Sequence, residues 1–338
     1  MTTKTKDSAA PEKTGADQAE PKLPTPGNAI SLLTPDKLKL LYASMLKCRM
    51  LENRVSKLSR NGTLSSRCRS YVGHEATAIA TTIDLAAEDT LAPSHRDVVT
   101  DFMRGMPLTS LFAPFFPRQR SAAALRTSSV SHLQAITPAS AIEAHFGMAA
   151  GIAVAYKLQK RSNVVLALAG YDSNSIGLWM ESLRYAGVNK LPIVYVVEED
   201  LGPHSVNENA VETLGEKLKG YGFPVITVDG NDAVAVYRVS SEALSRARNN
   251  GGPTLIDAKT SRWPAEDSDG GGERDPITHM EHYLKKRKLW SDDWCSELTE
   301  AFNRQIHQAI RSVQKSRTAE DNAGRVFSFC IRDANLPK

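Results

Sequence analysis

Two continuous apolar runs stand in the middle of the chain, at residues 164–169 and 192–197. Short runs without polar alternation suit strands that are buried on both faces of a sheet. Helical spacing of apolar residues marks the neighbouring segments 144–158 and 176–185. The pattern repeats further on, with predicted strands at 224–228 and 254–259 and predicted helices at 211–221 and 233–249. Strand and helix in alternation predict an α/β fold, with a parallel sheet and helices on both faces.

The first third of the chain predicts helices only. The sequence Thr34-Pro35-Asp36 predicts a helix N-terminus, with Thr as N-cap, Pro at the first helical position and an acid in the first turn. Apolar residues then recur at helical spacing as far as residue 57. Two further helices are expected at 75–85 and 102–115.

The two ends of the chain differ from its centre. Residues 1–29 are mostly charged or small and contain almost no apolar side chain, so they are expected to be disordered. We therefore predict a disordered tail at 1–29, one α/β domain at 30–316 and a C-terminal extension at 317–338.

Composition adds limits on partners and compartment. The chain of 338 residues is 41% apolar, which is enough for a sizeable core, and its net charge of +4 does not indicate a nucleic-acid partner. No apolar run approaches the roughly 18 residues that would span a bilayer, so no membrane partner is expected. Its four cysteines are scattered without a C-x-x-C pair, which predicts a reducing, cytoplasmic location.

A binding site is expected in the loops that follow the predicted strands, because ligands of parallel α/β sheets bind at the carboxyl ends of strands. The chain reads Gly-Tyr-Asp at 170–172, after the first apolar run, and Glu-Glu-Asp at 198–200, after the second. A third loop follows Lys259.

Six segments together carry a resemblance to a known family. In chain order they lie at 41–52, 71–76 (Tyr-Val-Gly-His-Glu-Ala), 93–97 (Pro-Ser-His-Arg-Asp), 228–232, 252–256 and 274–284 (beginning Arg-Asp-Pro-Ile). Each match is weak alone, but their order resembles the alpha subunit of a thiamine-diphosphate-dependent 2-oxo acid dehydrogenase. The likeness covers nearly all of the chain that is expected to be ordered.

The resemblance implies a thiamine diphosphate-binding fold and a reaction. Family members decarboxylate a 2-oxo acid and pass the acyl group to a lipoyl carrier, with thiamine diphosphate and magnesium as cofactors. A beta-type subunit completes the site in a heterotetramer, and a lipoyl acyltransferase core is a second implied partner.

The magnesium positions of the family are altered in this chain. Its first loop reads Gly-Asp-Gly in the family, which places Gly170 at the first glycine, Tyr171 at the metal ligand and Asp172 at the second glycine. Asp200 stands at the ligand Asn of the second loop. A Tyr phenol, which titrates near 10, is a poor magnesium ligand at neutral pH. Asp200 suits magnesium, and Asp172 would reach it if the loop shifted by one residue. The alternative is that both are solvated loop acids, and we expect no magnesium site to survive.

Two cofactor contacts are retained by type. The resemblance implies that Arg96 forks onto the diphosphate, a task suited to a planar guanidinium; the alternative is an ion pair with a neighbouring acid. Ile142 matches the apolar residue beside the aminopyrimidine, although any buried helix entry favours Ile. The two histidines that contact cofactor or substrate in the family are replaced by Arg69 and Glu266.

Two functions remain open on these grounds. One is an alpha subunit of the decarboxylating component with a degraded cofactor site. The other is a non-catalytic pseudoenzyme subunit that binds and stabilises a beta-type partner. Both need an oligomer, and the helices at 144–155 and 176–185 are apolar on more than one side, which predicts that a partner covers them.

Overall fold

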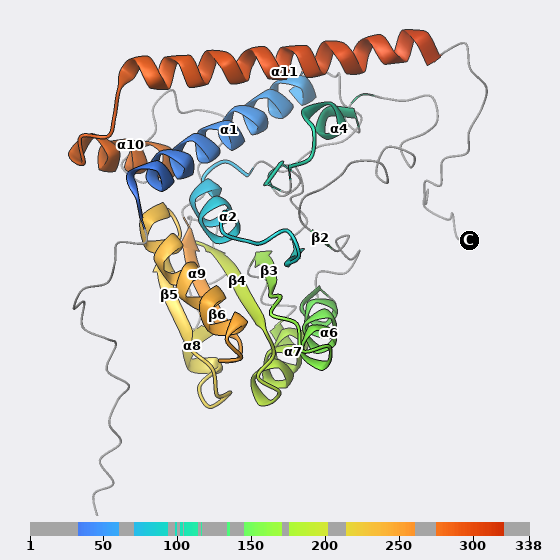
Figure 1. Ribbon diagram of the computed structural model, residues 1–338, viewed down its shortest axis with the longest axis vertical. Coiled ribbons are helices and arrows are strands. Elements are labelled where there is room, and N and C mark those ends of the chain that lie inside the picture. The colour runs from blue at the N-terminus through green and yellow to red at the C-terminus, as the bar shows by residue number, and fades with distance from the viewer. Residues whose placement is uncertain are drawn as a thin grey trace, which may run out of the picture.

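The structure is a computed structural model, and it describes residues 33–60, 71–93, 99, 102–103, 105–113, 116, 134–135, 145–170, 176–201, 214–260 and 275–320. Its described strands form one parallel sheet (Figure 1). The six strands are ordered β2-β1-β3-β4-β6-β5. Their bounds are β1 Thr90–Ala92, β2 Gln134–Ala135, β3 Val165–Gly170, β4 Ile193–Asp200, β5 Val225–Asp229 and β6 Thr254–Thr260.

The centre of the sheet consists of the strands that the apolar runs predicted. Every residue of β3 from Val165 to Ala169, and of β4 from Ile193 to Glu199, is buried. This burial on both faces explains why neither strand shows polar alternation. Strands β1 and β2 were not predicted, since three and two residues are too short to show a period.

Helices cover both faces of this sheet, as predicted. One face packs against α1 (Pro35–Arg60), α2 (Glu75–Thr82), α9 (Ala233–Arg248) and α10 (Pro276–Lys286). The other packs against α6 (His145–Leu158), α7 (Ile176–Val188) and the single turn α8 (Leu214–Lys217). The predicted α/β fold class is therefore confirmed.

A third apolar cluster lies away from the sheet. Helix α11 (Asp292–Glu320) runs alongside α1 and α4 (Leu108–Phe112) at one end of the molecule (Figure 1). The cluster is formed by residues of all three helices and Phe116: Leu51, Val55, Leu58, Leu111, Phe112, Phe302, Ile306, Ala309 and Ile310. Helix α11 continues past residue 316, so the predicted boundary between domain and extension falls within a helix and stays a prediction.

Local signals explain several element ends. The Thr34 hydroxyl accepts a hydrogen bond from the backbone N–H of Lys37 (3.2 Å), which confirms the predicted N-cap of α1. Asp232 caps α9 in the same way. The predicted helix at 211–221 was too long, because only α8 is helical in its described part. Gly220 adopts a φ of 93°, a conformation that glycine accepts readily and that does not continue a helix.

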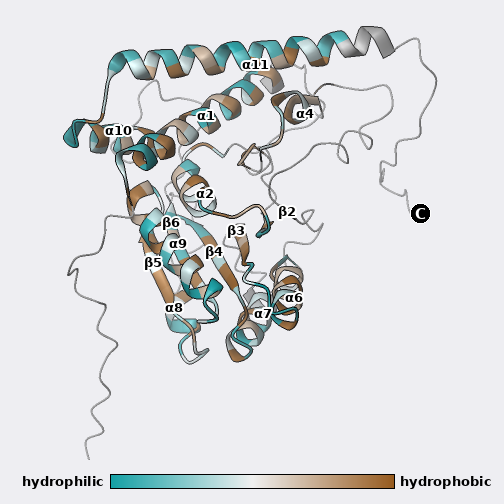
Figure 2. Cartoon of the chain, in the orientation of Figure 1, coloured by the Kyte–Doolittle hydropathy of each residue, from teal (hydrophilic) through white to brown (hydrophobic). Residues whose placement is uncertain are grey.

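Hydropathy follows this architecture (Figure 2). The strands are hydrophobic along most of their length, whereas polar residues line much of α11. Within the described ranges no helix combines the length and the apolar character that a membrane span requires.

Candidate functional site at the carboxyl ends of the strands

The carboxyl ends of β3, β4 and β6 lie side by side and form the edge where a ligand is expected. Ladder pairing places Gly170 of β3 opposite Glu198 of β4, and Asp200 opposite Thr260 of β6. The acids at 198–200 therefore belong to strand β4, whereas the sequence predicted that they lie in a loop. They are strand residues because their backbone continues to pair with β6, and this pairing does not depend on the side chains. Since side chains alternate along a strand, neighbouring acids of β4 point to opposite faces. The edge thus carries an acidic group on each face.

Two of the predicted site residues can be placed. Gly170 and Asp200 end neighbouring strands at this edge, and both are half-buried. Arg96, Ile142 and Asp172 lie outside the described residues, so their cofactor contacts stay predictions. The same holds for the positions at which the family pattern is replaced, Arg69, Tyr171 and Glu266.

On the face covered by α2, Glu198 meets two side chains of the turn that precedes this helix. The Tyr71 hydroxyl donates to Glu198 Oε1 at 2.8 Å, and His74 Nδ1 lies 3.6 Å from Glu198 Oε2. All three residues are buried. Neither ring nitrogen of His74 has a hydrogen-bond partner in the described part of the chain. We call Tyr71, His74 and Glu198 the Glu198 cluster: a phenol bonded to a buried carboxylate, with an imidazole next to it.

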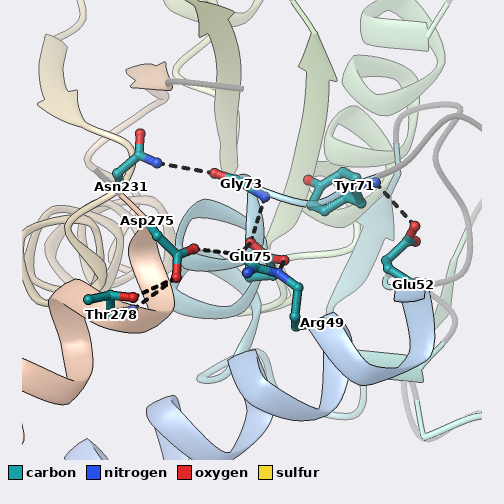
Figure 3. A network of polar contacts seen from close by, with 8 residues as sticks. All are labelled: Arg49, Glu52, Tyr71, Gly73, Glu75, Asn231, Asp275 and Thr278. Carbon is teal, nitrogen blue, oxygen red and sulfur yellow. Dashed lines mark hydrogen bonds and ion pairs between the residues drawn. The ribbon is translucent and has the colours of Figure 1, made fainter. Parts of the chain in front are cut away.

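Two buried carboxylates hold this turn in place (Figure 3). Glu52 accepts a hydrogen bond from the backbone N–H of Tyr71 (3.2 Å), and Glu75 accepts one from that of Gly73 (2.8 Å). Gly73 adopts a φ of 97°, which a residue with a Cβ rarely accepts. Its carbonyl accepts from the Asn231 side chain at 3.3 Å, which joins the turn to the end of β5. The turn therefore presents Tyr71 and His74 to the strand end from a fixed backbone.

The same turn is anchored to three helices by Arg49. Its guanidinium forks onto both oxygens of Glu75 and also donates to Asp275 Oδ1 at 2.7 Å (Figure 3). Burial opposes the charge on Arg49, but the two carboxylates outweigh it and raise the pKa of the guanidinium further. Burial raises the pKa of Asp275, but Arg49 and the hydrogen bonds from Thr278 outweigh it, so the pKa lies below its ordinary value. We call Arg49, Glu75 and Asp275 the Arg49 network.

On the opposite face of the sheet, a lysine joins two carboxylates. The Lys259 ammonium donates to Glu199 Oε2 and lies 2.9 Å from Asp257 Oδ2. Asp257 is completely buried, and its other oxygen has no hydrogen-bond partner among the described residues. Burial opposes the charge of Lys259, yet its hydrogen bonds to Glu199 and Asp257 raise the pKa of the ammonium. Lys259, Glu199 and Asp257 are called the Lys259 cluster.

A magnesium ion would need oxygen ligands in near-octahedral geometry, typically a few carboxylates together with phosphate oxygens. At this edge Asp200 is the predicted metal ligand, and its neighbour Glu199 is engaged by an ammonium. Over the described ranges, no three His, Cys, Asp or Glu side chains converge where they could hold a metal ion. The described donors do not fit a magnesium centre by themselves.

A second feature lies away from this edge, between α6 and α7. A shallow groove of about 450 Å³ is lined mainly by small and apolar residues: Gly147, Ala150, Gly151, Val154, Glu181, Ser182 and Tyr185. Tyr185, which lines the groove, is a large side chain exposed by 52%, and Val188 on the same helix is exposed by 74%. Helices α6 and α7, which form the groove, correspond to the two helices that the sequence predicted to be apolar on more than one side.

Sequence reasoning missed the partners of the strand-end acids. Tyr71 and His74 were noticed as part of a family motif, but their contact with Glu198 spans more than a hundred positions. Lys259 and Asp257 were read as part of an ordinary strand. Their signal was a pair of charges two positions apart in an otherwise apolar run, which places both on one buried face.

Comparison with known proteins gives a consistent result. The family model of the dehydrogenase E1 component matches residues 42–321. Among curated relatives, the pyruvate dehydrogenase E1 component subunit alpha of Staphylococcus aureus (strain Mu50 / ATCC 700699) is 30% identical over 301 residues, which cover 84% of this chain and 80% of the relative. The protein of the same description from Staphylococcus epidermidis (strain ATCC 12228 / FDA PCI 1200) has the same identity and coverage.

Proposed function

Because the chain belongs to the dehydrogenase E1 component family, we propose that it is an E1 alpha subunit whose role is to assemble with a beta-type subunit rather than to bind thiamine diphosphate and magnesium. The family match and its relatives make it an alpha subunit of 2-oxo acid dehydrogenase type. In active members thiamine diphosphate supplies the carbanion-storing ring, while the protein binds and orients it. The proposal is that this chain keeps the architecture and has lost that task.

One observation carries the proposal, namely the set of donors at the end of β4. Glu199 is paired with Lys259 on one face of the sheet, and on the other face Glu198 accepts a hydrogen bond from Tyr71, which leaves Asp200 as the acid at this strand end that the resemblance assigns to the metal. The sequence supplies Tyr171, a neutral phenol, where the resemblance places the family's Asp ligand. Glu266, at the place of a cofactor-binding histidine, would add a negative charge that repels a diphosphate.

A second candidate is a catalytic alpha subunit with an altered cofactor site. It is supported by the Glu198 cluster, which places a carboxylate, an imidazole and a phenol at the edge where ligands bind. Arg96 and Gly170 also match the family in sequence. This candidate still requires a beta-type chain, since the alpha chain supplies only half of the family's active site.

Titration calorimetry on the full chain, co-expressed with a beta-type chain, separates the two candidates. We expect no magnesium-dependent binding of thiamine diphosphate at micromolar concentrations. Tyr171→Asp combined with Asp172→Gly should restore measurable binding, and adding Asp200→Ala to that variant should abolish it again. Micromolar, magnesium-dependent binding by the wild-type complex would contradict the proposal and favour the catalytic candidate.

The assembly itself is proposed to use the groove between α6 and α7. A groove lined by Gly147, Gly151 and Val154 lets another helix approach closely, and Tyr185 offers an exposed aromatic ring beside it. We propose a heterotetramer with the beta-type chain, and a homodimer when the chain is expressed alone. Light scattering at micromolar concentration tests this, and Gly151→Arg should weaken association. A monodisperse monomer with and without the beta-type chain would contradict it.

Two further proposals concern the setting of this subunit. The lipoyl acyltransferase core is its second partner, reached through the E1 assembly. Its compartment is a reducing cytoplasm, which the two described cysteines support, since Cys48 and Cys295 are both free thiols.

A further inference from the structure

The Lys259 cluster brings a cation to the acids at this edge of the sheet, a feature that the proposed function does not explain. Lys259 and Asp257 are alternate residues of β6 and therefore share one face. Glu199 of β4 is the ladder partner of Lys259. The three side chains thus converge because of strand register.

Burial makes this convergence costly without a cation. Asp257 is completely buried and Glu199 nearly so, while the Lys259 side chain keeps 24% of its surface exposed. Two carboxylates that face one another away from water repel, and an uncompensated buried charge destabilises a fold strongly. The Thr227 hydroxyl also donates to Asp257 Oδ2, at 3.3 Å, but a hydroxyl brings no charge.

The chemistry of this group is that of a cation site. Two carboxylates and a threonine hydroxyl are all oxygen donors, the type that hard divalent cations prefer. A lysine ammonium is a compact point charge with three donors, so it can serve several oxygens at once. Two other buried acids are paired differently, because Asp89 pairs with Arg248 and Glu75 with Arg49, both through planar forks.

We infer that the Lys259 ammonium is the resident cation of this strand edge: it holds Glu199 of β4 to Asp257 of β6, so that the fold needs no divalent metal ion there. The inference goes beyond the proposed function, since it holds whichever chain covers the edge. It also follows from the misfit between these residues and a magnesium centre.

Replacing the lysine tests the inference on the full chain in the absence of cofactor. Lys259→Met keeps the aliphatic stem and removes the charge. In EDTA we expect its melting temperature to fall by about 5 °C or more. Millimolar Ca²⁺, Mg²⁺ or Mn²⁺ should restore at least half of this loss, whereas the wild-type melting temperature should be the same in EDTA and in metal. Binding of Mn²⁺ to the variant, followed by electron paramagnetic resonance, should show one ion per chain that the wild type lacks.

A matched control is Lys285→Met, which breaks an exposed ion pair with Glu281 on α10. Neither its stability nor its metal response should differ from wild type. An unchanged melting temperature of Lys259→Met in EDTA, or an equal metal response of variant and wild type, would overturn the inference.

If Lys259→Met does not fold, the double variant Lys259→Met with Glu199→Gln is used instead. It removes the ammonium together with one of the two repelling charges. Recovery of folding in the double variant supports the inference. Failure of both to fold would mean that the lysine stem, rather than its charge, is required, and would overturn it. Calorimetry with thiamine diphosphate is independent of these readouts, so a failure of the proposed function would be recognised separately.

Discussion

The Arg49 network and the strand edge beside it solve the same problem, the burial of carboxylates, in different ways. In the network one guanidinium serves Glu75 and Asp275, and Glu75 also accepts a backbone N–H. At the edge, Glu198 is met by a phenol and an imidazole and Glu199 by an ammonium. The network joins helices α1, α2 and α10, whereas the edge joins strands and a turn.

The comparison distinguishes residues that stabilise the fold, in the Arg49 network, from residues that determine the chemistry of the strand ends. By the resemblance, Asp200 is predicted to replace a ligand Asn of the family, whereas the Arg-Asp-Pro-Ile segment that supplies Asp275 matches the family. A chain can thus change its strand-end chemistry while the charges that fix the surrounding turn stay paired.

Removal of Arg49 should have the largest effect. Arg49→Met leaves Glu75 and Asp275 buried without their cation, and breaking a buried pair in this way costs about 3–5 kcal/mol. Urea unfolding measures it. Arg304→Met, which removes an exposed pair with Glu300 on α11, is the control and should be indistinguishable from wild type. A loss below about 1 kcal/mol for Arg49→Met would show that the network does not carry the fold.

Tyr71→Phe should have a smaller effect, because it takes one hydrogen-bond donor from the buried Glu198 and leaves the turn intact. The expected loss is about 1–3 kcal/mol in the free energy of unfolding, the usual range for a donor removed from a buried acceptor. Tyr185→Phe, on an exposed tyrosine, should change little. Equal losses in the two variants would argue that the Tyr71 hydroxyl contributes nothing beyond its ring.

The stability contributions of Asp275 and Asp257 should depend on pH with opposite signs, because their pKa values are shifted in opposite directions. Arg49 and Thr278 hold the pKa of Asp275 below its ordinary value near 3.8, so this carboxylate contributes stability that is present above that value and is lost as the pH falls through the folded pKa. Burial and Glu199 raise the pKa of Asp257 in spite of Lys259, so its contribution is present below its ordinary value and is lost as the pH rises through the folded pKa.

Unfolding in urea between pH 3 and pH 7 measures both contributions. Asp275→Asn should flatten the loss of stability below about pH 4, whereas Asp257→Asn should not. The effect is the smallest of the three, because a single carboxyl titrates in each case. An identical pH profile for the two variants would contradict the opposite signs.

The fold was predictable from the sequence wherever burial requires a recognisable pattern of apolar residues. Strands β3 and β4 are apolar because both of their faces are covered, and the N-cap at Thr34 needs only neighbouring residues. Strand β4 was predicted three residues too short, since its last residues are acids that still pair with β6. Helix α11 was not predicted, although Phe302, Ile306 and Ile310 recur at helical spacing, because the polar residues around them dominate its composition.

The site was predictable in place but not in content. Topology alone put Gly170 and Asp200 at one edge, because carboxyl ends of parallel strands meet there. The partners of the neighbouring acids come from far along the chain, since Glu199 and Lys259 are 60 positions apart. Such contacts depend on strand order and register, and no local pattern encodes either.

The position of α11 has a consequence for synthesis on the ribosome. The hydroxyl of Tyr42 in α1 contacts the Sγ of Cys295 in α11 at 3.4 Å, across a sequence separation of 253 residues. At the usual rate of about 5–20 residues per second, α1 emerges roughly 10–50 s before the helix that covers it. Until then Leu51 and Val55 have only the apolar partners that α4 and Phe116 supply, so one side of α1 stays exposed on the nascent chain for that interval.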